Sequence, residues 1–159
     1  MKTFKGKINQ LDKNQIFCFG SNPIGIQGAG SAGFASKRGW CSRNEKMNNC
    51  LSKSKKSWGI VTIKRPGDKK SLTLQKISEN IKKLYDFALK NPDKEFLIAY
   101  TGIQNRNLNG WTNSDLAWAF TQNQIPQNIV FEEKFYTLIE NWKTIQNKEK
   151  EKENKGFNL

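Results

Sequence analysis

Residues 16–33 read IFCFGSNPIGIQGAGSAG, and two patterns in this segment predict an α/β fold. The run Ile16–Phe19 is short, apolar and closed by Gly20, which is typical of a buried strand. Residues 20–33 then hold five glycines, so the backbone can take positive φ angles and approach a ligand closely. We expect a helix to follow, beginning near Ala29 and ending near Gly39.

The alternation of strands and helices continues through the rest of the chain. Apolar runs bounded by turn residues predict three more strands, at residues 58–63, 95–100 and 128–131. Apolar residues spaced three or four apart predict three more helices, over residues 74–88, 116–120 and 135–142. This alternation favours a mostly parallel, mixed sheet with helices on both faces, which is a three-layer α/β/α fold.

The length of 159 residues suits one domain with a tail. We expect the domain to cover residues 1–146. From Asn147 the chain alternates lysine and glutamate with almost no apolar residue, which predicts a frayed helix end or a disordered tail over 147–159. Residues 43–56 are polar, basic and without a clear period, and we interpret them as an irregular connection.

The composition argues against a membrane protein and against a protein with a structural zinc site. The chain has no apolar run of about eighteen residues, and its first residues lack the apolar stretch of a signal peptide. We therefore expect a cytoplasmic protein without a membrane partner. The three cysteines form no CxxC pair and the chain has no histidine, so neither a structural zinc site nor a disulfide framework is expected. Cys18 is interpreted as a core residue of its strand.

The formal charge of +13 leaves two interpretations open. A strongly basic protein attracts polyanions, because neutralised phosphates release their counterions. One alternative is thus a nucleic-acid-binding module in which the basic surface does the binding and the glycine loop is only structural. The other is a solvated basic surface with no specific partner.

Two loops follow the carboxyl ends of predicted strands, at Gly20–Gly30 and at Thr101–Gly110. In an open α/β sheet the ligand crevice lies at this edge, so the two loops can share one ligand. The amides of a glycine loop and the positive end of the next helix suit a phosphate or diphosphate. The side-chain amide of Asn22 both donates and accepts, which suits a ribose hydroxyl. The glycine spacing matches neither the classical dinucleotide fingerprint nor a P-loop.

The segment Ile16–Asn22 followed by Gly25–Gly30 resembles the first ligand loop of macro-domain-like proteins. The likeness is greatest to the small bacterial and phage branch, whose signature reads FGSN and then GxHGAG. It spans Gln15 to Phe131 and is strongest at this loop. Elsewhere it continues more loosely through Ile60–Lys64, Phe87–Pro92, Phe96–Tyr100 and Thr101–Gly110.

This resemblance implies a macro fold that binds ADP-ribose or a related nucleotide, and some relatives hydrolyse ADP-ribosyl links. The first loop and the loop from Thr101 would enclose the diphosphate and the distal ribose. Neither a cofactor nor a metal is implied. The ligand-binding residues expected in this chain are Gly20, Ser21, Asn22, Gly25, Ile26, Gly28, Ala29, Gly30, Thr101, Gly102, Ile103 and Gly110.

A more distant resemblance supplies one candidate catalytic residue. Terminal ADP-ribose protein glycohydrolase uses a lysine with an aspartate partner, and Lys64 stands at the comparable strand end in this chain. A buried lysine with a lowered pKa can attack a sugar carbonyl. The later loop has Arg106, Asn107 and Asn109 where the aspartate is expected, so the sequence favours a phosphate contact or an exposed lysine over catalysis.

Other polar and aromatic residues near the second loop have structural explanations. Asp115 falls in the first turn of a predicted helix, where the helix dipole favours a negative charge. Trp111 can stack on a nucleobase or lie at the rim of the core. The expected N-caps are Ser71 or Thr73 for the helix over 74–88, and Thr112, Asn113 or Ser114 for the helix over 116–120.

Overall fold

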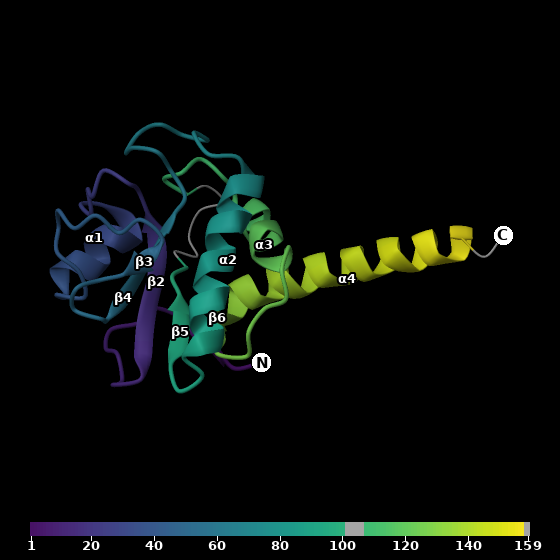
Figure 1. Cartoon of the computed structure of the whole chain (residues 1–159), viewed down its shortest axis with the longest axis horizontal. Coiled ribbons are helices and arrows are strands. Elements are labelled where there is room, and N and C mark those ends of the chain that lie inside the picture. Colours follow the sequence, from purple (N-terminus) through teal and green to yellow (C-terminus); the bar gives the residue numbers. More distant parts are fainter. Residues whose placement is uncertain (101–106, 158–159) are drawn as a thin grey trace.

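Six strands form one sheet in the computed structural model, which describes residues 1–100 and 107–157 (Figure 1). They are β1 (Thr3–Phe4), β2 (Gln15–Ser21), β3 (Cys50–Leu51), β4 (Ser57–Val61), β5 (Glu95–Ile98) and β6 (Ile129–Glu132). The strand order is β1-β6-β5-β2-β4-β3, and every neighbouring pair is parallel except β3 with β4. The mostly parallel, mixed sheet predicted from the sequence is confirmed.

Helices cover both faces of this sheet. On one face lies α1 (Gly30–Lys37), and on the other lie α2 (Leu74–Lys90), α3 (Asn113–Thr121) and α4 (Glu133–Phe157) (Figure 1). The fold is therefore a three-layer α/β/α arrangement, as the alternation of strands and helices predicts.

The side chains of the central strand β2 alternate between two cores. Phe17 and Phe19 pack beneath α1 with Ala35, whereas Ile16 and Cys18 belong to the core under α2, α3 and α4. A strand buried on both faces has a continuous apolar sequence, which is the pattern of residues 16–19. The predicted core position of Cys18 is confirmed, and burial raises the pKa of its thiol well above the usual value.

Side-chain caps define where α2 and α3 begin. Thr73, one of the two predicted candidates, caps α2 by accepting a hydrogen bond from the amide of Lys76 at 3.1 Å. Thr112 caps α3 and forms a capping box with Asp115, with bonds of 3.0 and 3.1 Å. The carboxylate of Asp115 thus has the structural role that its position in the first turn predicts.

Two short strands depart from the sequence-based expectation. β3 lies within residues 43–56, which were predicted to be irregular, and β1 lies near the N-terminus. Each has two residues, too few for a period of hydrophobicity to be visible. Both lie at the edges of the sheet, so tertiary pairing with β4 and with β6 produces them.

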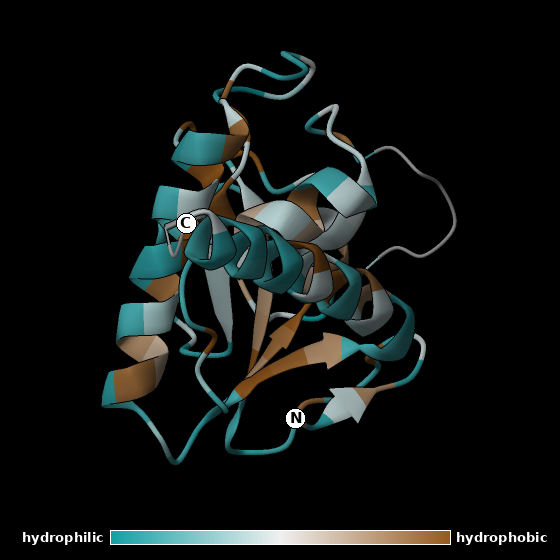
Figure 2. Cartoon of the chain, turned by 90° about the vertical axis from the view of Figure 1, so that its right-hand side faces the viewer, coloured by the Kyte–Doolittle hydropathy of each residue, from teal (hydrophilic) through white to brown (hydrophobic). Residues whose placement is uncertain are grey.

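The charged C-terminal segment is helical. α4 continues through Asn147 to Phe157, so of the two alternatives for residues 147–159 the described part is a helix end rather than a disordered tail. Lysine and glutamate are strong helix formers, and opposite charges three residues apart support a helix. Figure 2 shows these last turns to be hydrophilic, in contrast to the hydrophobic strands. No helix of the described residues is long and apolar enough to span a bilayer.

A hydrogen bond from Tyr85 joins α2 to the end of α3. Tyr85 is 2% exposed, and its hydroxyl donates to the carbonyl oxygen of Phe120 at 2.5 Å. That carbonyl lies among the last four of α3, which have no partner within the helix. Removal of the hydroxyl therefore leaves a buried acceptor unpaired.

Tyr85→Phe is expected to lower the free energy of unfolding by about 1–3 kcal/mol, the usual cost of an unsatisfied buried group. Urea denaturation followed by circular dichroism measures the change. Tyr136→Phe, on the half-buried part of α4, is the matched control and should change stability by less than about 0.5 kcal/mol. Equal effects of the two substitutions would contradict this account of Tyr85.

Candidate functional site

A cavity of about 770 Å³ opens at the carboxyl ends of β2, β4 and β5. These three strands are neighbours in the sheet, with β2 between the other two. Ligands of open α/β sheets bind at this edge, so the cavity lies where the sequence predicts a crevice. Its lining includes the ends of the strands and the residues just beyond them: Gly20, Ser21, Ile60, Thr62, Ile63, Ile98, Ala99 and Tyr100.

Most of the predicted residues of the first loop line this cavity. They are Gly20, Ser21, Asn22, Ile26, Gly28, Ala29 and Gly30. Gly25 does not line it. Of the predicted residues in the second loop, Gly110 lies outside the lining, and Thr101, Gly102 and Ile103 are outside the described residues. The cavity residues that the structure describes after β5 instead include Asn107, Leu108 and Asn109.

The side chain of Asn22 holds the first loop in shape. Its Oδ1 accepts from the amides of Ile24, Gly25 and Ile26 at 3.2, 3.0 and 3.3 Å. Its Nδ2 donates to the carbonyl of Ile26 at 2.9 Å, and the residue is 5% exposed. These bonds use Oδ1 and one of the two Nδ2 hydrogens, so Asn22 has a structural role in the loop, and its contact with a ribose hydroxyl stays a prediction.

Two glycines allow the close packing that shapes this loop. Gly25 has a φ of +87°, and a Cβ there would lie 2.8 Å from Cγ of Lys46. A Cβ at Gly33 would lie 2.9 Å from the carbonyl atoms of Gly28, so the first turn of α1 sits directly against the loop. Gly25 thus has a structural role rather than the predicted ligand contact.

A row of free backbone amides begins α1. Ala29 is the N-cap, with extended backbone angles of φ −142° and ψ 165°, and no side chain caps the helix. The amide of Gln27 donates to the carbonyl of Arg43, and that of Gly33 donates to Ala29. Between these two, the amides of residues 28–32 have no acceptor among the described residues. Gly28, Ala29 and Gly30 are exposed, so this amide row opens onto the cavity.

The electrostatic character of the cavity favours an anion. Of the described residues that line it, none carries a carboxylate, and Lys69 is the one cation. The positive end of the α1 dipole adds to the field at the amide row. Ile77, Ile81 and Leu116 supply apolar walls, while the buried Thr62 and Asn109 add polar groups to the lining. The cavity therefore suits a ligand that carries an anionic group and flat, largely apolar rings.

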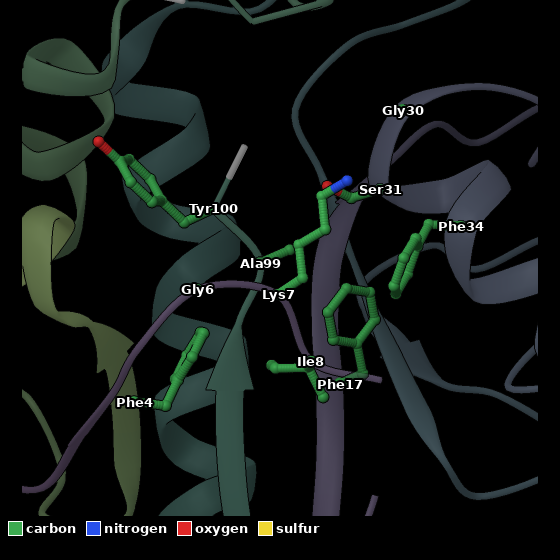
Figure 3. A pocket seen from close by; sticks show the side chains of 10 residues that line it. All are labelled: Phe4, Gly6, Lys7, Ile8, Phe17, Gly30, Ser31, Phe34, Ala99 and Tyr100. Carbon is green, nitrogen blue, oxygen red and sulfur yellow. The ribbon is translucent and has the colours of Figure 1, made fainter. Parts of the chain in front are cut away.

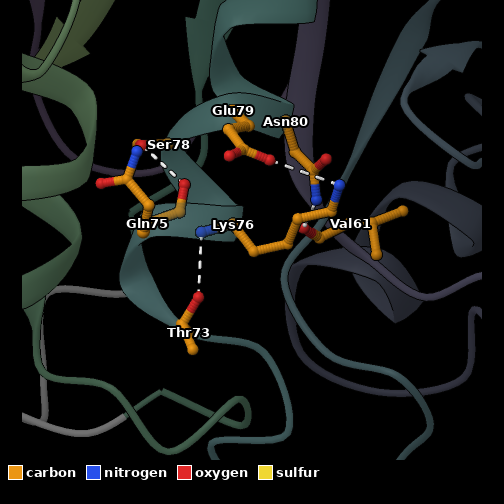
Figure 4. A network of polar contacts seen from close by, with 7 residues as sticks. All are labelled: Val61, Thr73, Gln75, Lys76, Ser78, Glu79 and Asn80. Atoms are coloured by element: carbon orange, nitrogen blue, oxygen red, sulfur yellow. Dashed lines mark hydrogen bonds and ion pairs between the residues drawn. The ribbon is translucent and has the colours of Figure 1, made fainter.

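Polar contacts fix the loops after β4 and β5, and helix α2, around the cavity. The amide of Lys70 donates to the carbonyl of Asn109 at 2.7 Å, which joins the loop after β4 to the loop after β5. Asn80 of α2 donates to the carbonyl of Val61 at 2.8 Å and so fixes α2 against the end of β4 (Figure 4). The loop after β5 is the second ligand loop that the sequence predicts. The loop after β4 is not identified from the sequence, where its one signal is its position after a predicted strand.

A smaller apolar pocket of about 260 Å³ adjoins the cavity (Figure 3). The two share Gly30, Ser31, Ala99 and Tyr100. The rings of Phe17 and Phe34, with centroids 6.0 Å apart, form one wall, with Ile8 beside Phe17 and Phe4 on the other side of the pocket. Burial, and then the charge of Glu132, raise the pKa of the Tyr100 hydroxyl, which stays neutral at physiological pH.

Lys64 and Trp111 do not line the cavity. Lys64 is exposed, and its backbone amide donates to Oγ of Ser71 at 2.9 Å. The cation that the structure places in the lining is Lys69, five residues later. Trp111 is half-buried at the core rim, with its Nε1 donating to the carbonyl of Leu72 at 3.0 Å. These placements argue against a catalytic Lys64 and against stacking of a nucleobase on Trp111.

Comparison with known proteins adds no family to this description. No protein-family model matches the chain, and no curated protein matches it significantly. The cavity, the amide row and the charges around them are therefore the features of this protein that bear on its function.

Proposed function

We propose that this protein binds ADP-ribose or a related nucleotide diphosphate in the cavity at the carboxyl ends of β2, β4 and β5. The observation that carries the proposal is the amide row of residues 28–32, which has no acceptor in the described structure and opens onto the cavity. Free amides at a helix N-terminus bind phosphate oxygens through hydrogen bonds and through the helix dipole. The absence of a carboxylate from the described lining keeps this end of the cavity favourable for a diphosphate.

The rest of the cavity suits the nucleoside parts of such a ligand. Apolar walls from β4, α2 and α3 can pack against a base or a ribose ring, and Thr62, Asn107 and Asn109 offer hydrogen-bonding groups. The macro-domain resemblance of residues 16–30 supports the same ligand class. Asn22 holds the loop in shape, and the loop packs against α1. Its backbone amides can therefore bind the phosphates without a charged side chain.

The proposal is limited to binding. Hydrolysis of ADP-ribosyl links would need a nucleophile or an acid–base group in the cavity, and Lys64 is exposed outside it. The described lining also offers no carboxylate as a general acid or base.

A ligand series should bind in the order ADP-ribose, then AMP, then adenosine, because phosphate groups provide the contacts with the amide row. Isothermal titration calorimetry measures each affinity. ADP-ribose at about 100 times its Kd should also stabilise the protein by about 2.7 kcal/mol, since a ligand that prefers the native state shifts unfolding. Absence of binding at millimolar ADP-ribose, or equal affinity for adenosine, would overturn the proposal.

A further inference from the structure

Three cations lie in the lining of the cavity and its adjoining pocket or beside a residue that lines the cavity, and we call them the rim cations: Lys7, Arg43 and Lys69. Lys69 lines the cavity and Lys7 lines the adjoining pocket. Nε of Arg43 would lie 4.0 Å from a Cβ at Gly28, which lines the cavity. Separate segments of the chain thus bring positive charge to one opening.

None of the rim cations forms an ion pair with another described residue. The nearest acids in sequence have other partners. The carboxylate of Glu45 accepts from the amides of Ser42 and Lys53 at 3.1 and 2.8 Å. The carboxylate of Asp68 pairs with Arg65, with Oδ2 3.9 Å from Nε. The charges of the rim cations are therefore available to a ligand, and a concave opening with charges of one sign concentrates their field.

We propose that the natural ligand is the end of a single-stranded nucleic acid. Its terminal nucleotide enters the cavity, with the phosphate on the amide row, and the rim cations hold the following phosphates of the strand. This inference rests on the proposed function, because it uses the same cavity. A recessed cavity admits one strand end and excludes the stacked pairs of a duplex, while repeated cations match the repeated phosphates outside it.

The test measures binding of a fluorescently labelled single-stranded oligonucleotide with a terminal phosphate at its unlabelled end, by anisotropy. Both DNA and RNA are used, with the phosphate at the 5′ or the 3′ end, and a circular strand of the same sequence is the matched ligand control. The linear strand should bind at least tenfold more tightly than the circle. ADP-ribose should displace it.

A double variant tests the rim cations. Arg43→Gln with Lys69→Gln should weaken oligonucleotide binding about tenfold more than it weakens ADP-ribose binding. It should also reduce the slope of log affinity against log salt by about 1.4, at about 0.7 for each lost phosphate contact. Lys83→Gln with Lys90→Gln, on the exposed face of α2, removes the same charge away from the cavity and should have little effect.

The outcomes separate this inference from the proposed function. Binding of ADP-ribose without binding of any oligonucleotide would overturn the inference and leave the proposed function standing. Equal affinity for linear and circular strands, or no competition by ADP-ribose, would place the strand on the basic surface outside the cavity and would also overturn it. If neither ADP-ribose nor any oligonucleotide binds to a protein with a normal melting transition, both the inference and the proposed function are overturned.

Discussion

Ala29→Asp is expected to stabilise the unliganded protein by about 1 kcal/mol and to weaken ADP-ribose binding at least tenfold. Ala29 already has the extended backbone of an N-cap, but alanine has no side-chain acceptor for the amides of the first turn. An aspartate would accept from Ser31 or Ala32 and would place a negative charge at the positive end of α1. The gain in stability and the loss of binding have the same cause, because both involve the amide row.

Chemical denaturation and isothermal titration calorimetry measure the two effects on one protein sample. Asn147→Asp is the control, since it adds the same charge at an exposed position of α4 far along the chain from the cavity. It should leave ADP-ribose affinity unchanged. An Ala29→Asp protein that binds ADP-ribose as tightly as the natural chain would show that the phosphates do not use these amides.

Asn22→Ala is expected to abolish measurable ADP-ribose binding and to lower the free energy of unfolding by about 1–3 kcal/mol. Its side chain makes four hydrogen bonds to the backbone of residues 24–26. Without them the loop loses the shape that directs residues 28–30 toward the cavity. The buried amide of Gly25 also loses its acceptor.

Asn128→Ala is the matched control for this substitution. Asn128 donates to the carbonyls of Ala88, Asn91 and Lys94 at 2.9, 3.1 and 3.0 Å, next to the amino end of β6. Its loss should destabilise the protein by a similar amount while ADP-ribose still binds below the melting temperature. If both variants lose binding in proportion to their stability, Asn22 has no special role in the loop.

The elements that the sequence predicts well are those whose pattern is local. The strand at Ile16–Phe19 is buried on both faces, so its apolar run is continuous, and glycines mark the turn into α1. The 17 residues of α2 show several turns of a helical period and a threonine N-cap. By contrast, β1 and β3 have two residues each and exist because neighbouring strands pair with them.

The residues of the candidate site that belong to one continuous segment could be predicted from the sequence. Those that reach the cavity through the order of the strands could not. Residues 20–30 combine a strand end, glycines and a helix start, and most of them line the cavity. Lys69 reaches the cavity because β4 lies next to β2, and no local pattern reveals that strand order. The role of Asn22 also escaped prediction, since an amide can bond a ligand or its own loop with equal chemistry.

The central claim is that the backbone amides at the start of α1 bind the phosphates of the ligand. Titration of ¹⁵N-labelled protein with ADP-ribose, followed by NMR, tests it directly, because each amide of residues 28–32 gives its own signal. We predict that the largest shifts occur at these five amides and saturate with the calorimetric affinity. Binding that leaves these five signals unmoved while others shift would contradict the account.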